Sequence, residues 1–348
     1  MFRYIIRRLI QAIPTFFGIT LLSYFIMSAA PGGPAAILAF DPSLPQGERE
    51  RLERLWGLDD PWVVQYVHWL IGDDWRQRDL SGDGEPDSWG SRQGILRGDF
   101  GQSFVRSRRP VIEMIGQFIL PTLELMIAAL ALGLFFGIPI GIIAAIRRGG
   151  TFDNVTRVFA VVFNAIPNFW LGLILILIFA SWLGWLPTSQ RCSPTASLAR
   201  GGGGCPPIYE RLEYMIMPVF TLGTVYIAGY SRYMRTSMLD VIGQDYIRTA
   251  HAKGLSSRMV WFRHGARNAM IPIATFLGPT ITGLLSGSVI TEQIFSWPGL
   301  GRQGLQAIIS LDYPFVMAFV VIGSVATILG YILSDILYAL IDPRIRFS

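Results

Sequence analysis

The feature that most limits the fold of this chain is a run of 22 residues without a charge at positions 9–30, directly after a basic segment with Arg3, Arg7 and Arg8. A helix of that length rises about 33 Å, which is enough to cross a hydrocarbon core of about 30 Å. A cleaved signal peptide is the alternative, because small residues occupy positions 28–30. The apolar core of a signal peptide spans only about 7–15 residues, so we predict a retained membrane-spanning helix.

Five further apolar runs predict an all-α integral membrane protein. Only 15% of the 348 residues are charged and 51% are hydrophobic, whereas a soluble domain carries about 25% charged residues. With the first run they predict six transmembrane helices, and the five further runs lie at residues 119–146, 158–183, 214–233, 270–290 and 315–340. The sequence contains no Gly-x-x-x-x-Gly-Lys-Ser/Thr loop, so any ATP hydrolysis must come from another chain.

Basic residues beside the predicted spans indicate the orientation, because cytoplasmic loops carry an excess of Lys and Arg. Arginines are frequent in the N-terminal segment, at residues 147–148, between residues 248 and 267, and near the C-terminus, whereas the opposite short loops hold few. We therefore expect both termini in the cytoplasm and an extracytoplasmic lobe at residues 31–111. The net charge of +5 does not indicate a nucleic-acid partner, because the basic residues flank apolar runs beside lipid.

An acidic stretch in this lobe has the spacing of a calcium loop. Oxygen donors fall at positions 1, 3, 5 and 9 of the motif, on Asp79, Ser81, Asp83 and Asp87. Glu85 would offer its backbone carbonyl, and a glycine follows Asp83 where the loop must turn sharply. Position 12 of the motif is also a glycine, where calcium loops usually have a bidentate Glu. A structural calcium site and a solvated acidic turn are therefore the two interpretations.

The chain has two cysteines, Cys192 and Cys205, and both lie in one predicted outer loop. An oxidising compartment permits a disulfide there, and closing a loop of this length stabilises the fold by about 3 kcal/mol in the chain-entropy model. We predict a bond between the two, with two free thiols as the alternative.

The most informative stretch connects the fourth and fifth runs. Small residues that let another protein approach the backbone closely alternate there with basic residues that keep the segment in water. The stretch contains Asp245, Arg248, Thr249, Ala250, His251, Ala252, Lys253, Gly254 and Leu255. Composition alone favours a solvated amphipathic connector.

The order of these residues resembles the cytoplasmic coupling loop of ABC importer permeases, the EAA loop, in the version of the dipeptide/oligopeptide/nickel permease family (first-subunit, B-type). Three other segments are similar to that family: RYIIRRL at residues 3–9, EQIFSWPGLGR at residues 292–302 and DILYALIDPRIR at residues 335–346. The resemblance covers nearly the whole chain. Two departures are the replacement of Glu-Ala-Ala by Arg248-Thr249-Ala250 and insertions at residues 73–94 and 191–207.

The resemblance implies a type I ABC importer permease fold and a subunit that does no covalent chemistry. The implied partners are a second homologous permease, two cytoplasmic ATP-binding subunits that hold ATP and Mg, and an extracytoplasmic solute-binding protein. The implied location is the cytoplasmic (inner) membrane of a bacterium or archaeon. Residues 1–30 would contain the first helix, residues 31–111 the lobe, and residues 112–348 the permease core with a coupling loop at about 236–269.

Polar residues within the apolar runs are candidates for the transport path. Asn164, Pro167 and Asn168 interrupt the third run and could form a polar gate, although Pro167 could also be a tolerated kink. Glu124 lies in the second run. A charge at the bilayer centre costs about 2.5–3.5 kcal/mol on insertion scales, so this carboxyl should face protein or water. Lining the path and bonding a neighbouring helix are both consistent with that.

Peptides are the cargo that the resemblance implies, with nickel chelates or glutathione as alternatives. An ion-coupled secondary transporter would show internal repeats, and none is clear in this sequence. An intramembrane zinc protease would need His-Glu-x-x-His, which the sequence lacks.

Overall fold

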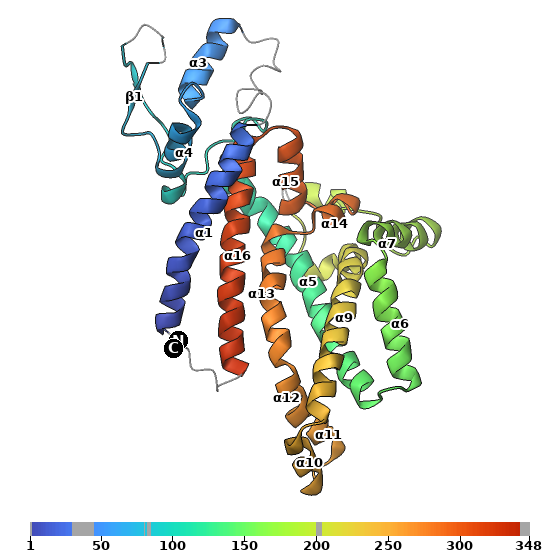
Figure 1. Ribbon diagram of the computed structural model, residues 1–348. Coiled ribbons are helices and arrows are strands. Elements are labelled where there is room, and N and C mark those ends of the chain that lie inside the picture. Colours follow the sequence, from blue (N-terminus) through green and yellow to red (C-terminus); the bar gives the residue numbers. More distant parts are fainter. Residues whose placement is uncertain (1, 30–44, 80, 82–84, 200–203, 342–348) are drawn as a thin grey trace. The chain divides into compact units, whose positions relative to one another are not determined.

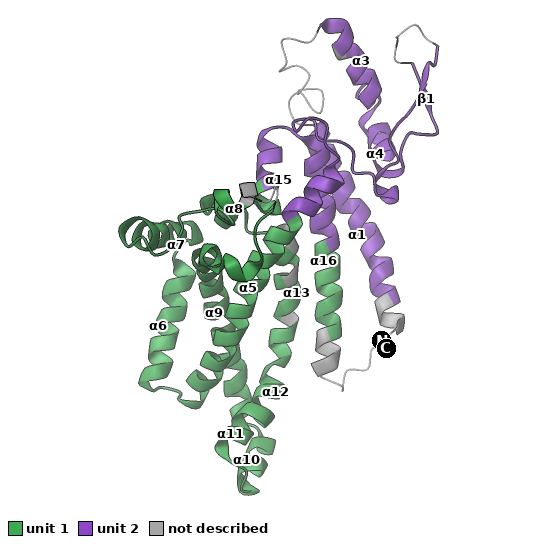
Figure 2. Cartoon of the chain, turned by 180° about the vertical axis from the view of Figure 1, so that it is seen from behind, with its two compact units in different colours: residues 1–5, 119–302, 326–348 green, residues 6–118, 303–325 purple. Residues whose placement is uncertain are grey.

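The computed structural model describes residues 2–29, 45–79, 81, 85–199 and 204–341, which are mostly helical (Figure 1). The chain forms two compact units (Figure 2). Unit 1 comprises residues 1–5, 119–302 and 326–348, and unit 2 comprises residues 6–118 and 303–325. The long helices α5 (Val111–Ile146) and α16 (Tyr313–Ile341) contribute residues to both units.

Unit 1 contains most of the helices. After α5 come α6 (Thr151–Ala165), α7 (Asn168–Leu175), the π-helical turn η3 (Ile176–Trp182), α8 (Pro194–Ala199), the short η4 (Ile208–Glu210) and α9 (Leu212–Ile242). Then follow α10 (Asp245–Ala252), α11 (Ser257–Met259), the π-helical turn η5 (Val260–Gly265), α12 (Ala266–Ala269), α13 (Ile271–Ser286), α14 (Val289–Ile294) and the start of α15 (Leu300–Ile309).

Four helices in the described residues are long and apolar enough to cross a membrane: α1 (Phe2–Ser28), α5, α9 and α16. They correspond to the first, second, fourth and sixth predicted runs. The fifth run forms α13, whose 16 residues are fewer than the about 20 that a span needs. The described part of the chain therefore supports four of the six predicted spans, or five if a bent helix pair is one span.

That bent pair corrects the prediction of one continuous helix at residues 158–183. Helices α6 and α7 meet at an angle of 98° across a short break, and Figure 1 shows α7 running across the end of α6. Pro167 explains the break, because proline disfavours the helical conformation in the residue before it. Ile166 accordingly has an extended backbone with ψ 124°, and Pro167 itself has ψ 131°.

Three glycines of α5, spaced four residues apart, bring this helix close to α9 within unit 1. A Cβ on Gly137 would lie 3.0 Å from the Cβ of Tyr230, and one on Gly141 would lie 2.6 Å from the Cβ of Met234. Gly133 meets Tyr226 in the same way. Small residues in this pattern let helix backbones approach, which matters in lipid because the hydrophobic effect does not drive helices together there.

Side chains from several elements then fill the core of unit 1 beside this contact. Met234 and Met238 of α9 are fully buried against Ala266, Ala269 and Ile273 of α12 and α13. At the start of α6, the buried carboxylate of Asp153 accepts hydrogen bonds from the Arg235 guanidinium of α9, one of them at 2.8 Å.

Unit 2 contains most of α1, then α3 (Gln46–Trp56), α4 (Trp62–Ile71), the two-stranded hairpin of β1 (Gln77–Arg78) and β2 (Ser88–Trp89), and η2 (Ile95–Arg97). The first residues of α5, most of α15 and the beginning of α16 complete it. The hydroxyl of Tyr66 in α4 lies 3.0 Å from that of Thr20 in α1. Tyr66 also packs with Tyr24 and with Met317 of α16.

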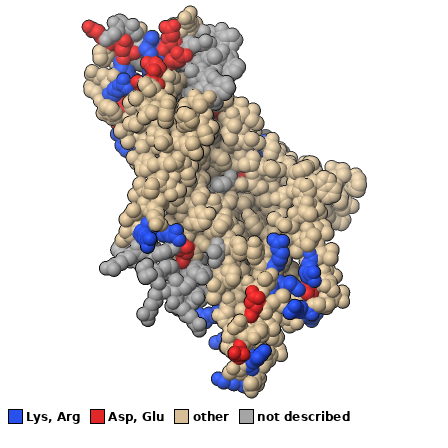
Figure 3. All heavy atoms as spheres, in the orientation of Figure 1, with Lys and Arg blue, Asp and Glu red and all other residues tan. Residues whose placement is uncertain are grey.

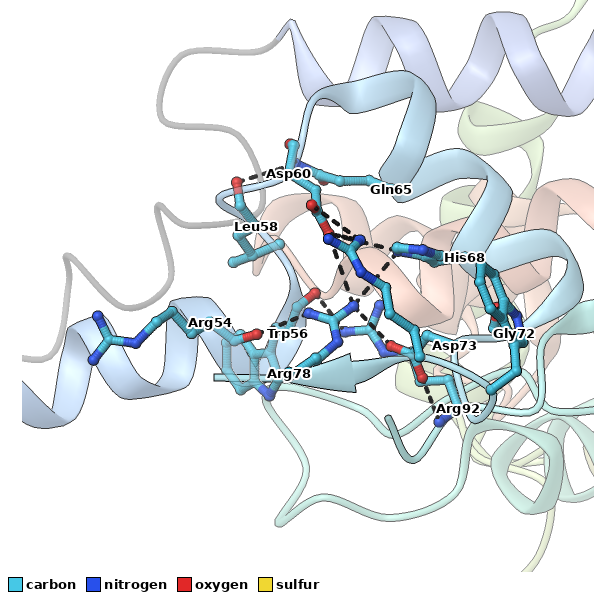
Figure 4. Close-up of polar contacts among 12 residues, drawn as sticks. Arg54, Trp56, Leu58, Asp60, Gln65, His68, Gly72, Asp73, Arg78 and Arg92 are labelled. Carbon is cyan, nitrogen blue, oxygen red and sulfur yellow. Dashed lines mark hydrogen bonds and ion pairs between the residues drawn. The ribbon is translucent and has the colours of Figure 1, made fainter. Parts of the chain in front are cut away.

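A buried carboxylate organises the polar part of unit 2 (Figure 4). The Asp73 side chain is 1% exposed, accepts a 2.8 Å hydrogen bond from Arg78, and accepts the backbone N–H of Arg92 at 2.9 Å. The two guanidiniums donate onward to the carbonyl oxygens of Arg54 and Trp56 at 2.8 and 2.9 Å. Because each carbonyl lies at the end of α3, the network fixes that helix to the hairpin and to the loop after it.

Charged side chains gather at particular places on each unit (Figure 3). In unit 1 they lie around α10–α12 and near the turn between α5 and α6, and in unit 2 many lie around α3 and the hairpin. The visible faces of the long helices are largely uncharged, as expected of surfaces that face lipid.

We predict that Gly141→Ala destabilises the protein by about 1–3 kcal/mol, because its Cβ would overlap Met234 of α9. Gly229→Ala on α9 is the matched control, because no atom lies within 4 Å of the added Cβ. Replacing a helical glycine by alanine at an open position should be neutral or stabilise by up to about 1 kcal/mol. Thermal unfolding in detergent measures both, and equal shifts of the midpoint would contradict the close α5–α9 contact.

Candidate functional site

Helix α10 is a short amphipathic helix with one face against unit 1. Ile247 and Ala250 are buried and form a small apolar cluster with Val260 of η5. The opposite face is exposed and consists of Asp245, Arg248, Thr249, His251 and Ala252, followed by Lys253. The predicted connector is therefore a helix held to the core by one face, with the other face free to meet a second protein.

Gly254 ends this helix in a way that needs glycine. Its φ is +75°, in the left-handed region where a side chain is unfavourable. Its N–H donates to the carbonyl oxygen of His251 at 2.9 Å, and the N–H of Leu255 donates to that of Ala250 at 3.3 Å. No atom lies within 4 Å of a Cβ built on Gly254, so any side chain there would project into open space.

The structure adds a groove that the sequence interpretation missed. It is a shallow, open groove of about 480 Å³, lined by Ser256, Arg258, Met259, Phe262 and Arg263. Met259 and Phe262 are 41% and 47% exposed, although both are large apolar residues. Their spacing of three residues, between arginines, is a signal for an exposed apolar stripe on a helix.

The three predicted gate residues lie together at the bend between α6 and α7. Asn164 and Pro167 are exposed, and Asn168 begins α7 half-buried. They lie at the break between the two helices, as expected of residues that interrupt the third apolar run. That they form a gate in the transport path stays a prediction.

The Glu124 carboxylate forms ion pairs with two arginines. Its carboxylate accepts hydrogen bonds from Arg191 at 2.6 and 3.0 Å and from Arg211 at 2.8 and 3.1 Å. The loop between the two arginines is closed by the predicted disulfide, Cys192–Cys205, with a Cα–Cα distance of 5.8 Å. Glu124 thus ties α5 to this loop, which is one of the two interpretations of its charge.

The acidic loop gives no support for a metal site. Asp79, Ser81, Glu85 and Asp87 belong to the β1–β2 connection, and Asp83 lies outside the described residues. Ser81 donates its backbone N–H to Asp87 at 3.0 Å and its hydroxyl to Asp79 at 3.1 Å. Among the described residues, no group of three or more His, Cys, Asp or Glu side chains is arranged to hold a metal. Calcium binding stays an unsupported prediction.

A buried carboxyl that the sequence interpretation did not single out lies between α14 and α15. Glu292 is 0% exposed and forms no ion pair within the described residues. Its Oε2 accepts the N–H of Arg302 at 2.8 Å, and its Oε1 accepts the Thr122 hydroxyl of α5 at 2.9 Å. The Thr122 oxygen in turn accepts the N–H of Leu300 at 2.7 Å. Two side chains therefore satisfy the first amides of α15, which a helix cannot satisfy itself.

Two glycines make room for this carboxyl. A Cβ on Gly287 would lie 2.6 Å from Glu292 Oε1, and a Cβ on Gly299 would overlap the carboxyl group directly. Burial raises the pKa of Glu292, and the hydrogen bonds from Arg302 and Thr122 oppose that rise. Hydrogen bonds from a backbone N–H and a hydroxyl, rather than an ion pair, therefore offset the cost of burying the Glu292 carboxyl.

Comparison with known proteins identifies the family. Residues 137–347 match the binding-protein-dependent transport system inner membrane component, and residues 1–92 match the N-terminal part of such membrane components. The chain belongs to this family. As a binding-protein-dependent permease, it is a non-catalytic, inner-membrane component of an ABC transporter that crosses the membrane several times. The family resemblance of residues 245–255 and the three other segments is thereby confirmed.

The alignments with three named relatives extend over the whole or nearly the whole of this permease. It is 40% identical to the oligopeptide transport system permease protein AppB of Bacillus subtilis (strain 168), with 100% of both chains covered. It is 36% identical to the dipeptide transport system permease protein DppB of Escherichia coli (strain K12), with 99% of each covered. It is 35% identical to the glutathione transport system permease protein GsiC of the same strain, with 100% of each covered.

One solved structure is also similar in part. A chain from inward-facing conformations of the MetNI methionine ABC transporter aligns with a TM-score of 0.47 and 15% identity, covering 68% of this permease and 98% of that chain.

We predict that Glu292→Ala lowers the stability of the permease by about 2 kcal/mol or more, because it leaves the buried donors of Arg302 and Thr122 without an acceptor. Glu292→Gln keeps one acceptor oxygen and should cost less. Glu213→Ala, at an exposed carboxylate of α9 in the same unit, is the control and should change little. Thermal unfolding of the purified protein checks the order, and a Glu292→Ala midpoint equal to that of Glu213→Ala would contradict the role of Glu292.

Proposed function

We propose that this chain is one of two homologous permease subunits of an importer for dipeptides and oligopeptides. The observation that carries the proposal is its similarity along its whole length to permeases named for oligopeptide and dipeptide transport, at 40% and 36% identity. The relative named for glutathione, at 35% identity, makes glutathione, itself a short peptide, the second candidate. Nickel chelates, which the family resemblance also implies, are the third candidate.

The exposed face of α10 and the adjacent groove are the proposed docking surface for a cytoplasmic ATPase. A helix anchored by Ile247 and Ala250 can move as one piece with the core when a partner pushes on its other face. Met259 and Phe262 offer apolar surface beside the arginines of the groove, a combination typical of protein interfaces. ATP and Mg would bind to that partner.

The orientation follows from the same surface. Unit 1 carries its exposed arginines around α10–α12 and near the start of α6, and basic residues favour the cytoplasmic side. Basic residues at the start of the chain and near its C-terminus follow the same rule. Both termini would then be cytoplasmic, and residues 31–111, which lie between the first two apolar runs, would be extracytoplasmic, where a solute-binding protein would deliver the cargo. The bend at Asn164, Pro167 and Asn168 would then face the path shared with the second permease.

The cargo is tested by uptake into vesicles that contain the complete importer with its binding protein. Unlabelled dipeptides and oligopeptides should compete with a labelled dipeptide, and a nickel chelate should not. Competition by glutathione alone would replace the peptide assignment by the second candidate.

The coupling surface is tested in the same vesicles with Gly254→Glu. We expect the variant to insert and assemble, but its uptake per ATP hydrolysed should fall at least about tenfold. The reason is that a charged side chain would project from the docking surface and disturb the interface. A tenfold change corresponds to about 1.4 kcal/mol, which is less than the binding free energy of a stable protein interface.

Gly149→Glu is the matched control for this variant. Gly149 lies in the turn between α5 and α6, has φ +77°, and also has no atom within 4 Å of an added Cβ. It introduces the same charge and the same backbone strain outside the proposed surface, so uptake per ATP should stay near normal. Equal losses in both variants, or normal uptake by Gly254→Glu, would refute the placement of the coupling surface.

A further inference from the structure

A basic patch lies in unit 1 at the end where α5 turns into α6, and Figure 3 shows basic side chains gathered near this turn. It consists of five arginines from three neighbouring segments: Arg147, Arg148, Arg157, Arg232 and Arg235. The first two follow α5 in the turn, the third is on α6, and the last two are on α9. Helices α6 and α9 pack against each other, so the fold brings these arginines to one end of the unit.

A single carboxylate lies within this basic patch, and it is already used. Asp153 is buried and accepts a 2.8 Å hydrogen bond from the Arg235 guanidinium and a 2.9 Å hydrogen bond from a backbone N–H of the turn. The other four arginines are exposed and form no ion pair within the described residues. The next acid along α9 is Asp240, eight residues and about 12 Å beyond Arg232. The patch therefore presents an excess of positive charge to its surroundings.

The surface of α6 beside the patch is apolar and uncovered. Val155, Val158 and Val161 are 60%, 64% and 67% exposed, and no charged residue occurs at positions 158–190. Arg157 lies on the same face of the helix as Val161, which follows it by four residues. An apolar helix face of this kind is suited to lipid acyl chains, which are as apolar as leucine. The arginines thus border the surface that acyl chains would cover.

An exposed tyrosine indicates the level of the patch relative to the membrane. Tyr233 of α9 is 38% exposed, and the guanidinium carbon of Arg232 lies 5.8 Å from the centre of its ring. Tyrosine concentrates where hydrocarbon gives way to the headgroup region. Arginine side chains at this level can keep their stems on apolar surface while their guanidiniums reach the headgroups. The patch is therefore placed to meet the phosphates of one leaflet.

The position of the patch within unit 1 favours a lipid over a protein partner. Figure 1 shows α10 and α11 extending beyond the turn between α5 and α6, so a protein on the exposed face of α10 would approach from the water. The patch lies further back, where the uncharged surface of α6 begins. A molecule that joins an anionic headgroup to acyl chains can contact the arginines and the valines at once, and clustered basic residues beside transmembrane helices bind anionic headgroups.

We propose that this patch binds an anionic phospholipid, whose phosphate accepts hydrogen bonds from the exposed guanidiniums and whose acyl chains lie along the valines of α6. Only the assignment to the cytoplasmic leaflet rests on the proposed function and its orientation. The bound lipid would connect α6 to α9 through their arginines and hold this end of unit 1 at the membrane surface. Its contacts are separate from the exposed face of α10.

The test measures binding of phosphatidylglycerol and of phosphatidylcholine with the same acyl chains to the delipidated full-length chain, by native mass spectrometry in detergent. We expect the wild type to prefer phosphatidylglycerol at least about tenfold. Each arginine at an anionic surface contributes about fivefold, so Arg147→Gln with Arg148→Gln should weaken binding of phosphatidylglycerol at least about tenfold. Binding of phosphatidylcholine should stay as it was.

Arg108→Gln with Arg109→Gln is the matched control. These two adjacent arginines are also exposed and precede the other end of α5, so the control removes the same charge outside the patch. It should change binding of phosphatidylglycerol less than about twofold. Thermal unfolding in detergent without lipid should give the same midpoint for both variants and the wild type, which separates lost lipid from a damaged fold.

Equal binding of the two lipids by the wild type, or equal losses in the two variants, would overturn the proposal. Displacement of phosphatidylglycerol by inorganic phosphate at the same concentration would assign the patch to a free anion and overturn it as well. Cross-linking of Arg148→Cys to the ATPase subunit in the complete importer would assign the patch to that partner instead. Because lipid binding is measured on the chain alone, a failed uptake assay leaves that result unaffected.

Discussion

Hydrocarbon offers no hydrogen-bond partner to a peptide group, so a chain that crosses a bilayer must satisfy its backbone within helices. The long helices α5, α9 and α16 follow this rule. The departures from it are few and each has a local explanation. Pro167 breaks the third run, and the amides at the start of α15 are satisfied by Glu292 and Thr122. Glu292 can occupy a buried position only because Gly287 and Gly299 leave space for its carboxyl.

The same constraint explains how the helices are joined. Lipid is as apolar as a leucine side chain, so helices in it associate by close packing and by polar contacts rather than by the hydrophobic effect. Gly137 and Gly141 supply the close packing between α5 and α9. Asp153 with Arg235, and Glu124 with two arginines, supply polar contacts between distant parts of unit 1. Charges within or just outside the apolar runs thus join helices and loops in unit 1.

Local sequence signals predicted much of this arrangement. Apolar runs predicted the positions of the four long helices, and two cysteines in one outer loop predicted the disulfide. The small and basic residues at 245–255 predicted an amphipathic connector, which the structure shows to begin with α10. The 98° bend was not predicted, because Pro167 within an apolar run is equally consistent with a mild kink. The role of Glu292 was missed because its burial depends on Thr122, which is 170 residues away in sequence, and no local pattern reports such a contact.

Coupling in the proposed importer depends on α10, which would face the cytoplasm and receive the ATPase. The most direct test of this placement is cross-linking from a cysteine introduced at Ala252, which is exposed. Both native cysteines are bonded to each other, so the new thiol is the single free one in the chain. In membranes that contain the complete importer, Ala252→Cys should cross-link to the ATPase subunit, and Ser91→Cys on the lobe should not. Cross-linking of Ser91→Cys to the ATPase, with Ala252→Cys reached only by reagents added outside the cell, would contradict the account.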